Sequence, residues 1–428
     1  GGRRRRGGAG GPSMVARDDT SSQDPVCALV DASQAEHARR QLDRAGLLGA
    51  RAFRSPDGRI ALPLSEEGAG TLTDELASSM GVRILELSRL PLTGRGAGDL
   101  HARLHSSALR ALEAAGVPAA AALEALPASA MPHRWEKLGD VVLFGPVGCF
   151  APDSAVASLA AAARHALWSS LAEALGAARL GVQGRIAQEG EAAAALQLQR
   201  KAAHVLQRKS GARLLWPEGA DGWTEHRCNG IVYGLDVRCS MFSSGNGTEK
   251  ARVARLRCEG ETVVDLYAGI GYFTLPYLVH ARAAHLHACE WDEDALVALR
   301  RNLVRNGVAA DRYTVHPGDN AASVAAFDGV AHRVNLGLIP SSEAGWPVAV
   351  AALRPEGGWL HVHANVGSAE TDEAAWSERL LCMLCRHAEA AGRQWHLSLV
   401  HLERVKWYAP RVRHVVADVL AKPATTSS

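Results

Sequence analysis

The stretch that decides the fold of this chain is Val263–Leu278, which reads VVDLYAGIGYFTLPYL. A run of β-prone residues ends at Asp265, and Gly269 and Gly271 then form a G-x-G turn before the segment that follows. A strand and a glycine turn followed by a helix are typical of nucleotide-binding domains, whose ligand lies at the carboxyl end of the strand. The ligand of this turn could be a phosphate, a dinucleotide or an adenosyl group that carries a sulfonium.

The first two ligands fit the turn less well. A phosphate-binding loop ends in G-K-[ST], and the residues from Gly271 to Phe273 do not match that ending. A dinucleotide turn has the pattern G-x-G-x-x-G, and Thr274 stands where its third glycine would be. G-x-G by itself is a weak signal, so a purely structural turn is also an open alternative at this point.

Carboxylates at the ends of later strands favour the sulfonium. Asp265 ends the first predicted strand, Glu290 the second and Asp319 the third, all at one edge of the predicted sheet. Such an edge repels a phosphate but not a cation. We expect Glu290 to accept hydrogen bonds from the ribose hydroxyls, and Asp319 with Asn320 to bind the adenine edge. Asp265, beside the Gly269 turn, is expected to face the methionine end.

The segment before this domain, MFSSGNGTEKARVARLRC, supplies two more candidates. Its Gly245-Asn246-Gly247 run allows a tight loop, and Thr248 can cap the helix that follows. Ser243 and Lys250, on either side of the loop, could hold the carboxylate of a methionine moiety, the lysine acting as a point charge. A simple domain connector with a solvated lysine explains the segment equally well.

From about Thr262 onward the pattern alternates between strands and helices, which predicts parallel strands with helices on both faces of a sheet. Two final strands, HLSLVHLERV and RHVVADVLA, are joined through Tyr408-Ala409-Pro410 without a helix, which predicts one antiparallel strand. We therefore expect an α/β fold: a class I S-adenosylmethionine-dependent methyltransferase-like Rossmann domain, preceded by smaller α/β or α+β domains.

The domain organisation follows from changes in composition along the 428 residues. An Ala-rich tract from about Ser154 to Lys209 favours helix, because alanine and long straight side chains lose little entropy there. Met14 is a possible natural start. We expect a disordered leader at 1–25, a small N-terminal α/β module at 26–90, a middle domain with an Ala-rich helical insertion at 101–240 and the S-adenosylmethionine-binding catalytic domain at 241–424.

Composition limits the classes of partner. The formal net charge is only +2, which argues against a protein that binds polyanions over its whole surface. Residues 201–257, however, hold ten Lys and Arg against five Asp and Glu. This local excess fits a face that follows nucleic-acid phosphates, although a solvated helix face explains it nearly as well.

Cysteine usage and hydropathy bear on the compartment. Eight cysteines in a chain of this length are too sparse for a disulfide scaffold, and the lone C-x-x-C of Cys382 and Cys385 predicts buried reduced thiols rather than zinc ligands. No run approaches ~20 consecutive apolar residues, and the arginine-rich start lacks the apolar core of a secretory signal. We expect a cytoplasmic protein with no membrane segment and no metal.

Taken together, FSSGNGTEK, DLYAGIGYFTLP, CEWDEDALVALRRNL, GDN, RVNLGLIPSSEAGWP and LHVHANV resemble the tRNA wybutosine-synthesizing protein 2 group. That group is a sister of the tRNA guanosine-37 N1-methyltransferases. The similarity is dense over Gly222–Val366 and extends to VKWYAPRVRHVV. It implies transfer of the 3-amino-3-carboxypropyl group of S-adenosylmethionine to 4-demethylwyosine, a tricyclic base next to the anticodon of tRNA-Phe, with release of methylthioadenosine.

The resemblance also implies roles for single residues and partners. It places cofactor contacts on Ser243, Lys250, Glu290, Asp319 and Asn320, and a tRNA-Phe anticodon stem-loop against the front and middle domains. The protein is expected to be a monomer that acts alone or with other wybutosine-pathway enzymes.

One loop bears on which group is transferred. The segment Asn335–Ser342, NLGLIPSS, has the form of the aminocarboxypropyl transferases, whereas the methyltransferase sisters carry a short Asn-[Leu/Pro]-Pro loop there. Asn335 is a candidate for binding the base edge, or else a polar residue that ends a strand, and no general base is assigned. A guanosine-37 N1-methyltransferase and a catalytically inert tRNA-binding relative are the alternatives, the latter because the Ala-rich tract does not match the β-rich middle domain of the group.

Overall fold

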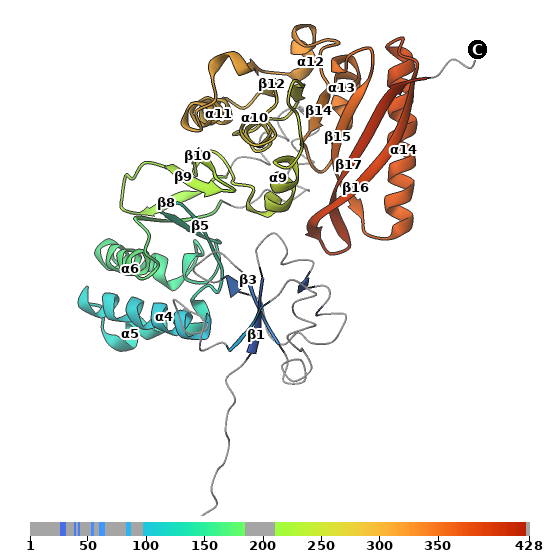
Figure 1. Cartoon of the computed structure of the whole chain (residues 1–428). Helices are drawn as coiled ribbons and strands as arrows, with labels where there is room; N and C mark the ends of the chain where they lie inside the picture. Colours follow the sequence, from blue (N-terminus) through green and yellow to red (C-terminus); the bar gives the residue numbers. More distant parts are fainter. Residues whose placement is uncertain are drawn as a thin grey trace, which may run out of the picture. The chain divides into compact units, whose positions relative to one another are not determined.

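The computed structural model of the chain describes residues 26–30, 38–39, 42, 53–54, 60–64, 83–86, 97–184 and 210–424 (Figure 1). The chain divides into two compact units, residues 1–102 and 103–428. The predicted leader at 1–25, with Met14, and the second half of the Ala-rich tract, 185–209, lie outside the described residues.

The first unit contains a four-stranded antiparallel sheet. Its strands have the order β2-β3-β1-β4 and are β1 (Val26–Val30), β2 (Phe53–Arg54), β3 (Ile60–Pro63) and β4 (Arg83–Glu86). The side chains of Val30, Ala38, Leu42 and Leu62 are buried. The strand VCALV and the two short strands on either side of the predicted Pro56-Asp57-Gly58 turn are therefore confirmed, whereas the turn itself lies outside the described residues.

The second unit begins with a small mixed layer of helices and strands. Its elements are the greater part of α4 (Ala97–Ala114), which starts in the first unit, followed by α5 (Ala119–Ala125), β5 (Trp135–Leu138), β6 (Val141–Phe144), α6 (Ala161–Ala174), β7 (Arg179–Val182) and β8 (Arg213–Trp216). The sheet order is β5-β6-β7-β8, and only the central pair β6 and β7 is parallel. Phe144, Phe150 and Trp168 stack in sequence within this layer, with ring centroids 4.2 and 4.9 Å apart.

The predicted Ala-rich helix is only partly correct. The helix α6 is present, but residues 179–182 form the strand β7 instead. Gly181 explains why: a Cβ there would lie 2.8 Å from the carbonyl oxygen of Arg213 on the adjacent strand, so the two backbones approach at a distance that glycine alone permits. Sheet pairing on both sides outweighs the helical preference of the surrounding alanines.

A two-stranded hairpin, β9 (Trp223–Cys228) and β10 (Ile231–Asp236), follows. Its turn is the predicted Asn229-Gly230 pair, and both residues have positive φ, 50° and 77°. Asn302 of the later helix α11 (Glu293–Arg305) fixes the hairpin, because its side chain bonds both the N–H and the carbonyl of Gly234, at 2.7 and 2.9 Å.

A seven-stranded sheet dominates the remainder of the chain (Figure 1). Its order is β13-β12-β11-β14-β15-β17-β16, and β17 runs in the direction opposite to the other six strands. The strands are β11 (Thr262–Asp265), β12 (His285–Glu290), β13 (Tyr313–Pro317), β14 (Arg333–Leu336), β15 (Gly358–Gly367), β16 (Trp395–Ala409) and β17 (Val412–Pro423). The predicted α/β fold, with one antiparallel strand, is confirmed.

Helices cover both faces of this sheet. They are α9 (Gly247–Val253), α10 (Thr274–Val279), α11, α12 (Asn320–Ser323), α13 (Trp346–Ala352) and α14 (Glu370–Ala390), and Figure 1 shows α14 against β16. Val263 belongs to a core cluster with Leu275 of α10, and its neighbour Val264 to a second cluster with Leu380 of α14. Both valines are fully buried, as expected for a strand covered on its two faces.

The predicted pair of buried thiols is wrong. Cys382 is exposed and Cys385 is only partly covered; both are free. The helix α14 buries Leu380 and Leu384, and Cys382, two residues from each, points to the opposite side of the helix.

Two kinds of feature are absent from the described residues. No helix among them has the length and apolar character needed to cross a membrane. Nor does this part of the chain bring three or more His, Cys, Asp or Glu side chains together as a set of metal ligands.

Candidate functional site

The site is built at the carboxyl edge of the seven-stranded sheet, around the glycine turn after β11. Gly269 and Gly271 have φ of 57° and 100°, values that side chains rarely adopt. A Cβ on Gly269 would also lie 3.1 Å from the ring of Tyr272. Asn302 steadies the turn from α11 by donating a 2.9 Å hydrogen bond to the carbonyl of Ile270. The turn is thus held in one shape before any ligand binds.

Glu290, at the end of β12, is 7% exposed, and three backbone N–H groups fix its carboxylate. Gly269 donates to Oε2 at 2.7 Å, while Trp291 and Asp292 each donate to Oε1 at 2.9 Å. Asp292 in turn caps α11 by accepting from the N–H of Ala295. A carboxylate has about four acceptor positions. Among the described residues, one position is therefore left for a hydroxyl donor, which suits one ribose hydroxyl rather than the two expected, and the ribose contact stays a prediction.

Asp265 and Asn335 form a fully buried pair at the ends of β11 and β14. Oδ1 of Asp265 accepts a 2.9 Å hydrogen bond from Nδ2 of Asn335, and Oδ2 accepts from Oγ1 of Thr274 at 2.8 Å. Burial raises the pKa of Asp265, and the two hydrogen bonds oppose that shift. Asp265 therefore joins two strands and the start of α10. Its contact with a methionine end stays a prediction.

Asn335 has one feature that its structural role does not explain. Its Oδ1 is buried and has no hydrogen-bond partner within residues 97–184 and 210–424 or the other described segments. Gly337 crowds the same place, because a Cβ there would lie 3.1 Å from Nδ2 of Asn335 and 3.2 Å from the Phe273 ring. An unpaired buried acceptor is costly, which makes this atom a candidate for accepting a hydrogen bond from a bound molecule.

Lys250 is buried to 1% exposure on α9. Its Nζ lies 4.7 Å from the ring centroid of Phe242, 5.0 Å from that of Tyr233 and 5.8 Å from that of Tyr272. The carbonyl of Ser243 lies 3.5 Å from the same Nζ. Burial lowers the pKa of Lys250, and the neighbouring charge of Lys406 adds to the effect.

Among the described residues, no carboxylate forms an ion pair with this ammonium. The adjacent Glu249 pairs with Arg252 instead, at 2.8 Å. A buried cation is stable only with an anionic or aromatic partner. Lys250 has the aromatic one, and the anionic one could come from a ligand.

Asp319 and Asn320 complete the edge beyond β13. Asp319 caps α12 by accepting from the N–H of Ala321 at 3.1 Å. Asn320 donates a 3.1 Å hydrogen bond to the carbonyl of Leu266, which ties the third strand end to the first. The sheet therefore brings the ends of β11, β12 and β13 together at one edge, as expected, and the adenine contact of Asp319 and Asn320 stays a prediction.

Two features of the site escaped the sequence analysis. The aromatic side chains around Lys250 come from β10, from the glycine turn and from the loop before α9. Among them, Tyr272 lies within Val263–Leu278, so the sequence of that stretch could have indicated it. The second is a buried network: Arg252, beside Lys250, pairs with Asp418 on β17, which also contacts Nδ1 of His361 at 2.6 Å. A pairing across 166 positions leaves no local signal in the sequence.

This chain matches a known class of domain and a known protein family. Residues 224–388 match the TRM5/TYW2 methyltransferase domain, so the site belongs to an S-adenosylmethionine-dependent transferase domain of that class. The mouse tRNA wybutosine-synthesizing protein 2 homolog is 38% identical over 87% of this chain and 88% of its own length, and the human homolog is 37% identical with the same coverage. The chain belongs to the tRNA wybutosine-synthesizing protein 2 family.

Longer relatives and solved structures agree with this membership. The tRNA wybutosine-synthesizing protein 2/3/4 of Arabidopsis thaliana is 45% identical over 68% of this chain, which spans only about a quarter, 26%, of that protein's length. A crystal structure of Pyrococcus horikoshii TYW2 in complex with MeSAdo has 25% identity and a TM-score of 0.53, covering 76% of this chain and 100% of its own. The Pyrococcus abyssi Trm5b structure, with 18% identity, a TM-score of 0.51 and coverage of 93% of this chain and 99% of its own, shares the fold.

Proposed function

We propose that the chain transfers the 3-amino-3-carboxypropyl group of S-adenosylmethionine to 4-demethylwyosine beside the anticodon of tRNA-Phe, in wybutosine biosynthesis. Its family membership supports the substrate and the pathway. Bound S-adenosylmethionine supplies a sulfonium, whose three attached carbons are all electrophilic. The base attacks the arm carbon bonded to sulfur, that bond breaks with its electron pair on sulfur, and the displaced proton passes to solvent. Methylthioadenosine is the second product.

The observation that carries this proposal is the buried ammonium of Lys250, which has no carboxylate partner among the described residues. A carboxylate on the methionine arm fits it in charge and in size. Phe242, Tyr233 and Tyr272 exclude water around Nζ, which strengthens the pairing. Lys250 therefore fixes one end of the arm that is to be transferred.

The other end of the donor fits the strand ends. The carboxylate of Glu290, with one acceptor position left, suits a ribose hydroxyl, and Asp319 with Asn320 suits the adenine edge. Two anchored ends determine which sulfonium carbon faces the nucleophile, and such orientation is worth several orders of magnitude in rate.

We assign the binding of the base to the loop after β14. It is tied to β15, because the carbonyl of Pro340 accepts from the N–H of Asn365 at 2.8 Å and Ser342 Oγ donates to the carbonyl of His363 at 3.3 Å. Asn335 Oδ1, which has no hydrogen-bond partner in the part of the chain that the structure describes, can accept a hydrogen bond from the base edge. The residues needed here bind and orient, and no general base is invoked.

The remaining parts of the proposal rest on the sequence. They are a tRNA-Phe anticodon stem-loop as the partner, a monomer that works alone or with other wybutosine-pathway enzymes, and a cytoplasmic location. A structure of a Trm5–tRNALeu complex, aTrm5, lies among the fold relatives, with 16% identity, a TM-score of 0.50 and coverage of 92% of this chain and 99% of its own; it shares the fold alone.

The by-product tests the proposed function. The protein is incubated with S-adenosylmethionine and with tRNA-Phe that carries 4-demethylwyosine, and the small molecules are separated by chromatography. Methylthioadenosine formed only in the presence of this tRNA supports the proposal. S-adenosylhomocysteine would instead indicate a methyltransferase, and neither product with the tRNA still bound would indicate an inert binding protein.

A further inference from the structure

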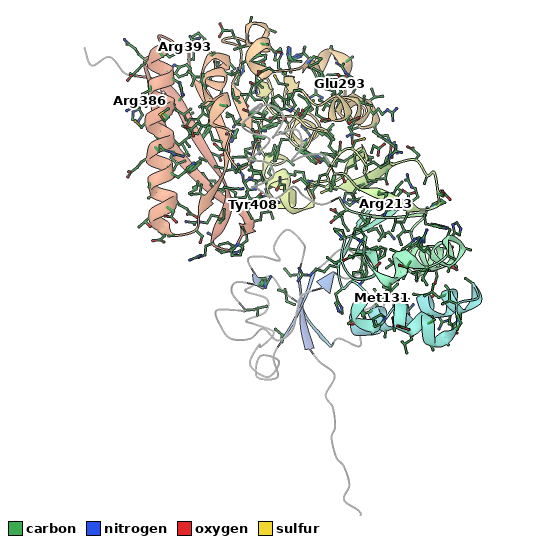
Figure 2. All side chains as sticks on the ribbon, turned by 180° about the vertical axis from the view of Figure 1, so that it is seen from behind. Met131, Arg213, Glu293, Arg386, Arg393 and Tyr408 are labelled. Atoms are coloured by element: carbon green, nitrogen blue, oxygen red, sulfur yellow. The ribbon has the colours of Figure 1, made fainter. Side chains whose placement is uncertain are left out.

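The tip of the hairpin between β16 and β17 exposes two large aromatic side chains. Trp407 is 60% and Tyr408 55% exposed, just before the turn at Pro410 and Arg411. The tip stands at the carboxyl edge of the sheet, because Val412 pairs with Gly367, the last residue of β15. Figure 2 labels Tyr408 at that end of the two long strands. Neighbouring apolar side chains exposed together on a soluble protein often mark an interaction site.

The aromatic pair is surrounded by positive charge. Residues 400–414 hold four cations and one acid, Glu403; the cations are Arg404, Lys406, Arg411 and Arg413. A surface that binds another protein through apolar contacts alone would not need this excess of positive charge. Cations beside exposed aromatic rings are instead typical of surfaces that bind single-stranded nucleic acid, where the rings stack on bases and the cations meet phosphates.

The ring of Trp407 is held in place by Arg413, which packs against it. The guanidinium of Arg413 lies 4.4 Å from its centroid, and Nη1 of Arg413 lies 3.6 Å from Oε1 of Glu373. Glu373 is 4% exposed on α14 and also pairs with Arg404, at 2.6 Å. This arrangement presents the ring in one orientation, so little entropy is lost when a partner stacks on it.

The hairpin also touches the candidate site. Lys406 packs on Gly245, where a Cβ would lie 2.6 Å from Nζ of the lysine. Gly245 belongs to the loop between Ser243 and Lys250, the two residues expected to hold the methionine carboxylate. The hairpin that carries Trp407 and Tyr408 therefore reaches the loop at which the methionine arm is expected to bind.

We propose that Trp407 and Tyr408 form a stacking platform for an unpaired nucleotide that neighbours the modified base, with Arg411 placed for its phosphate. This inference rests on the proposed function, since it assigns a contact to the RNA substrate. Loops of RNA are recognised mainly through unstacked bases that stack on aromatic side chains.

The test is binding of a fluorescein-labelled RNA hairpin with the anticodon stem-loop sequence of tRNA-Phe, followed by fluorescence anisotropy. Trp407→Ala and Tyr408→Ala are each expected to weaken binding about tenfold, while Trp407→Phe, which keeps a ring, retains most of the affinity. Val400→Ala is the matched control, because Val400 lies on the same strand and is equally exposed, at 55%. A fully paired duplex of the same length should bind all four variants alike.

Two controls separate the possible failures. Thermal unfolding and calorimetric binding of S-adenosylmethionine should be unchanged in the hairpin variants. If the Trp407→Ala, Tyr408→Ala double variant binds the stem-loop as tightly as the wild type does, the two residues do not form a stacking platform for RNA. Failure of the wild type to bind the stem-loop also overturns it. By contrast, a wild type that binds the stem-loop but yields no methylthioadenosine refutes the proposed function and not the platform.

Discussion

The backbone N–H of Gly269 donates a 2.7 Å hydrogen bond to Oε2 of Glu290, which joins the glycine turn after β11 to the end of β12. This bond connects two parts of the site that were predicted separately, namely the glycine turn and the carboxylate that is expected to bind the ribose. With Trp291 and Asp292 also donating to the same side chain, Glu290 is oriented before a ligand arrives.

Replacing Glu290 should therefore weaken binding of the donor. Glu290→Ala is expected to reduce S-adenosylmethionine affinity at least tenfold, because a hydrogen bond to a charged group contributes about 1.5–3 kcal/mol. Isothermal titration calorimetry measures the change. Glu293→Ala, an exposed acid three residues further on, is the control and should bind normally. Unchanged affinity of Glu290→Ala would place the ribose elsewhere.

Lys250 should distinguish two ligands that differ only in the transferred group. Lys250→Met keeps the length of the side chain but removes the charge. It is expected to lower S-adenosylmethionine affinity about tenfold or more, while methylthioadenosine, which lacks the carboxylate, binds as tightly as to the wild type. Calorimetry with both ligands makes the comparison. Equal losses for the two ligands would show that Lys250 does not contact the methionine arm.

Asn335 should matter for both stability and transfer. Asn335→Ala removes a hydrogen bond to buried Asp265, so the free energy of unfolding should fall by about 1–3 kcal/mol. Asn306→Ala is the matched control, because the side chain of Asn306 also makes hydrogen bonds, to the backbone of Val232, but at the C-terminal end of α11. At a temperature where both variants are folded, only Asn335→Ala should lose transfer activity. Equal activities would leave Asn335 a purely structural residue.

A buried histidine pair predicts acid sensitivity. His363 Nδ1 and His414 Nε2 are 3.1 Å apart, and burial lowers the pKa of His414 to about 4, with Lys406 contributing. The unfolded chain takes up this proton near its usual pKa of 6.5, so it binds more protons than the folded chain between about pH 6.5 and 4. The free energy of unfolding should therefore fall as the pH is lowered through that window.

The size of this effect is measurable. At pH 5 His414 alone should cost about 2 kcal/mol relative to pH 7. Urea unfolding at both pH values should show a smaller pH-dependent loss for His414→Asn than for the wild type. His396→Asn, at an exposed position on β16, should change nothing. An unaltered pH dependence in His414→Asn would mean that this ring does not control it.

The sequence was sufficient for the sheet and for the strand ends, because these depend on local patterns. Two adjacent valines, Val263 and Val264, require a strand covered on both faces, and an acid after each of the first three strands is placed by topology alone. The position of Glu290 at the carboxyl edge of the sheet could therefore be predicted from the sequence alone.

Contacts between distant segments could not be predicted in this way. Asp265 turned out to be fully buried and engaged with Asn335, because β14 lies beside β11 although 70 residues separate the pair. The surroundings of Lys250 likewise combine Tyr233 and Tyr272 from separate elements. Burial and long-range pairing are properties of the packed chain, and a single sequence does not display them.

The identity of the transferred group tests the central claim most directly. The protein is given tRNA-Phe that carries 4-demethylwyosine, with S-adenosylmethionine labelled in one reaction at the carboxyl carbon and in another at the methyl carbon. We predict that the carboxyl label enters the tRNA and the methyl label leaves as methylthioadenosine. Methyl label in the tRNA, with S-adenosylhomocysteine as the second product, would contradict the account.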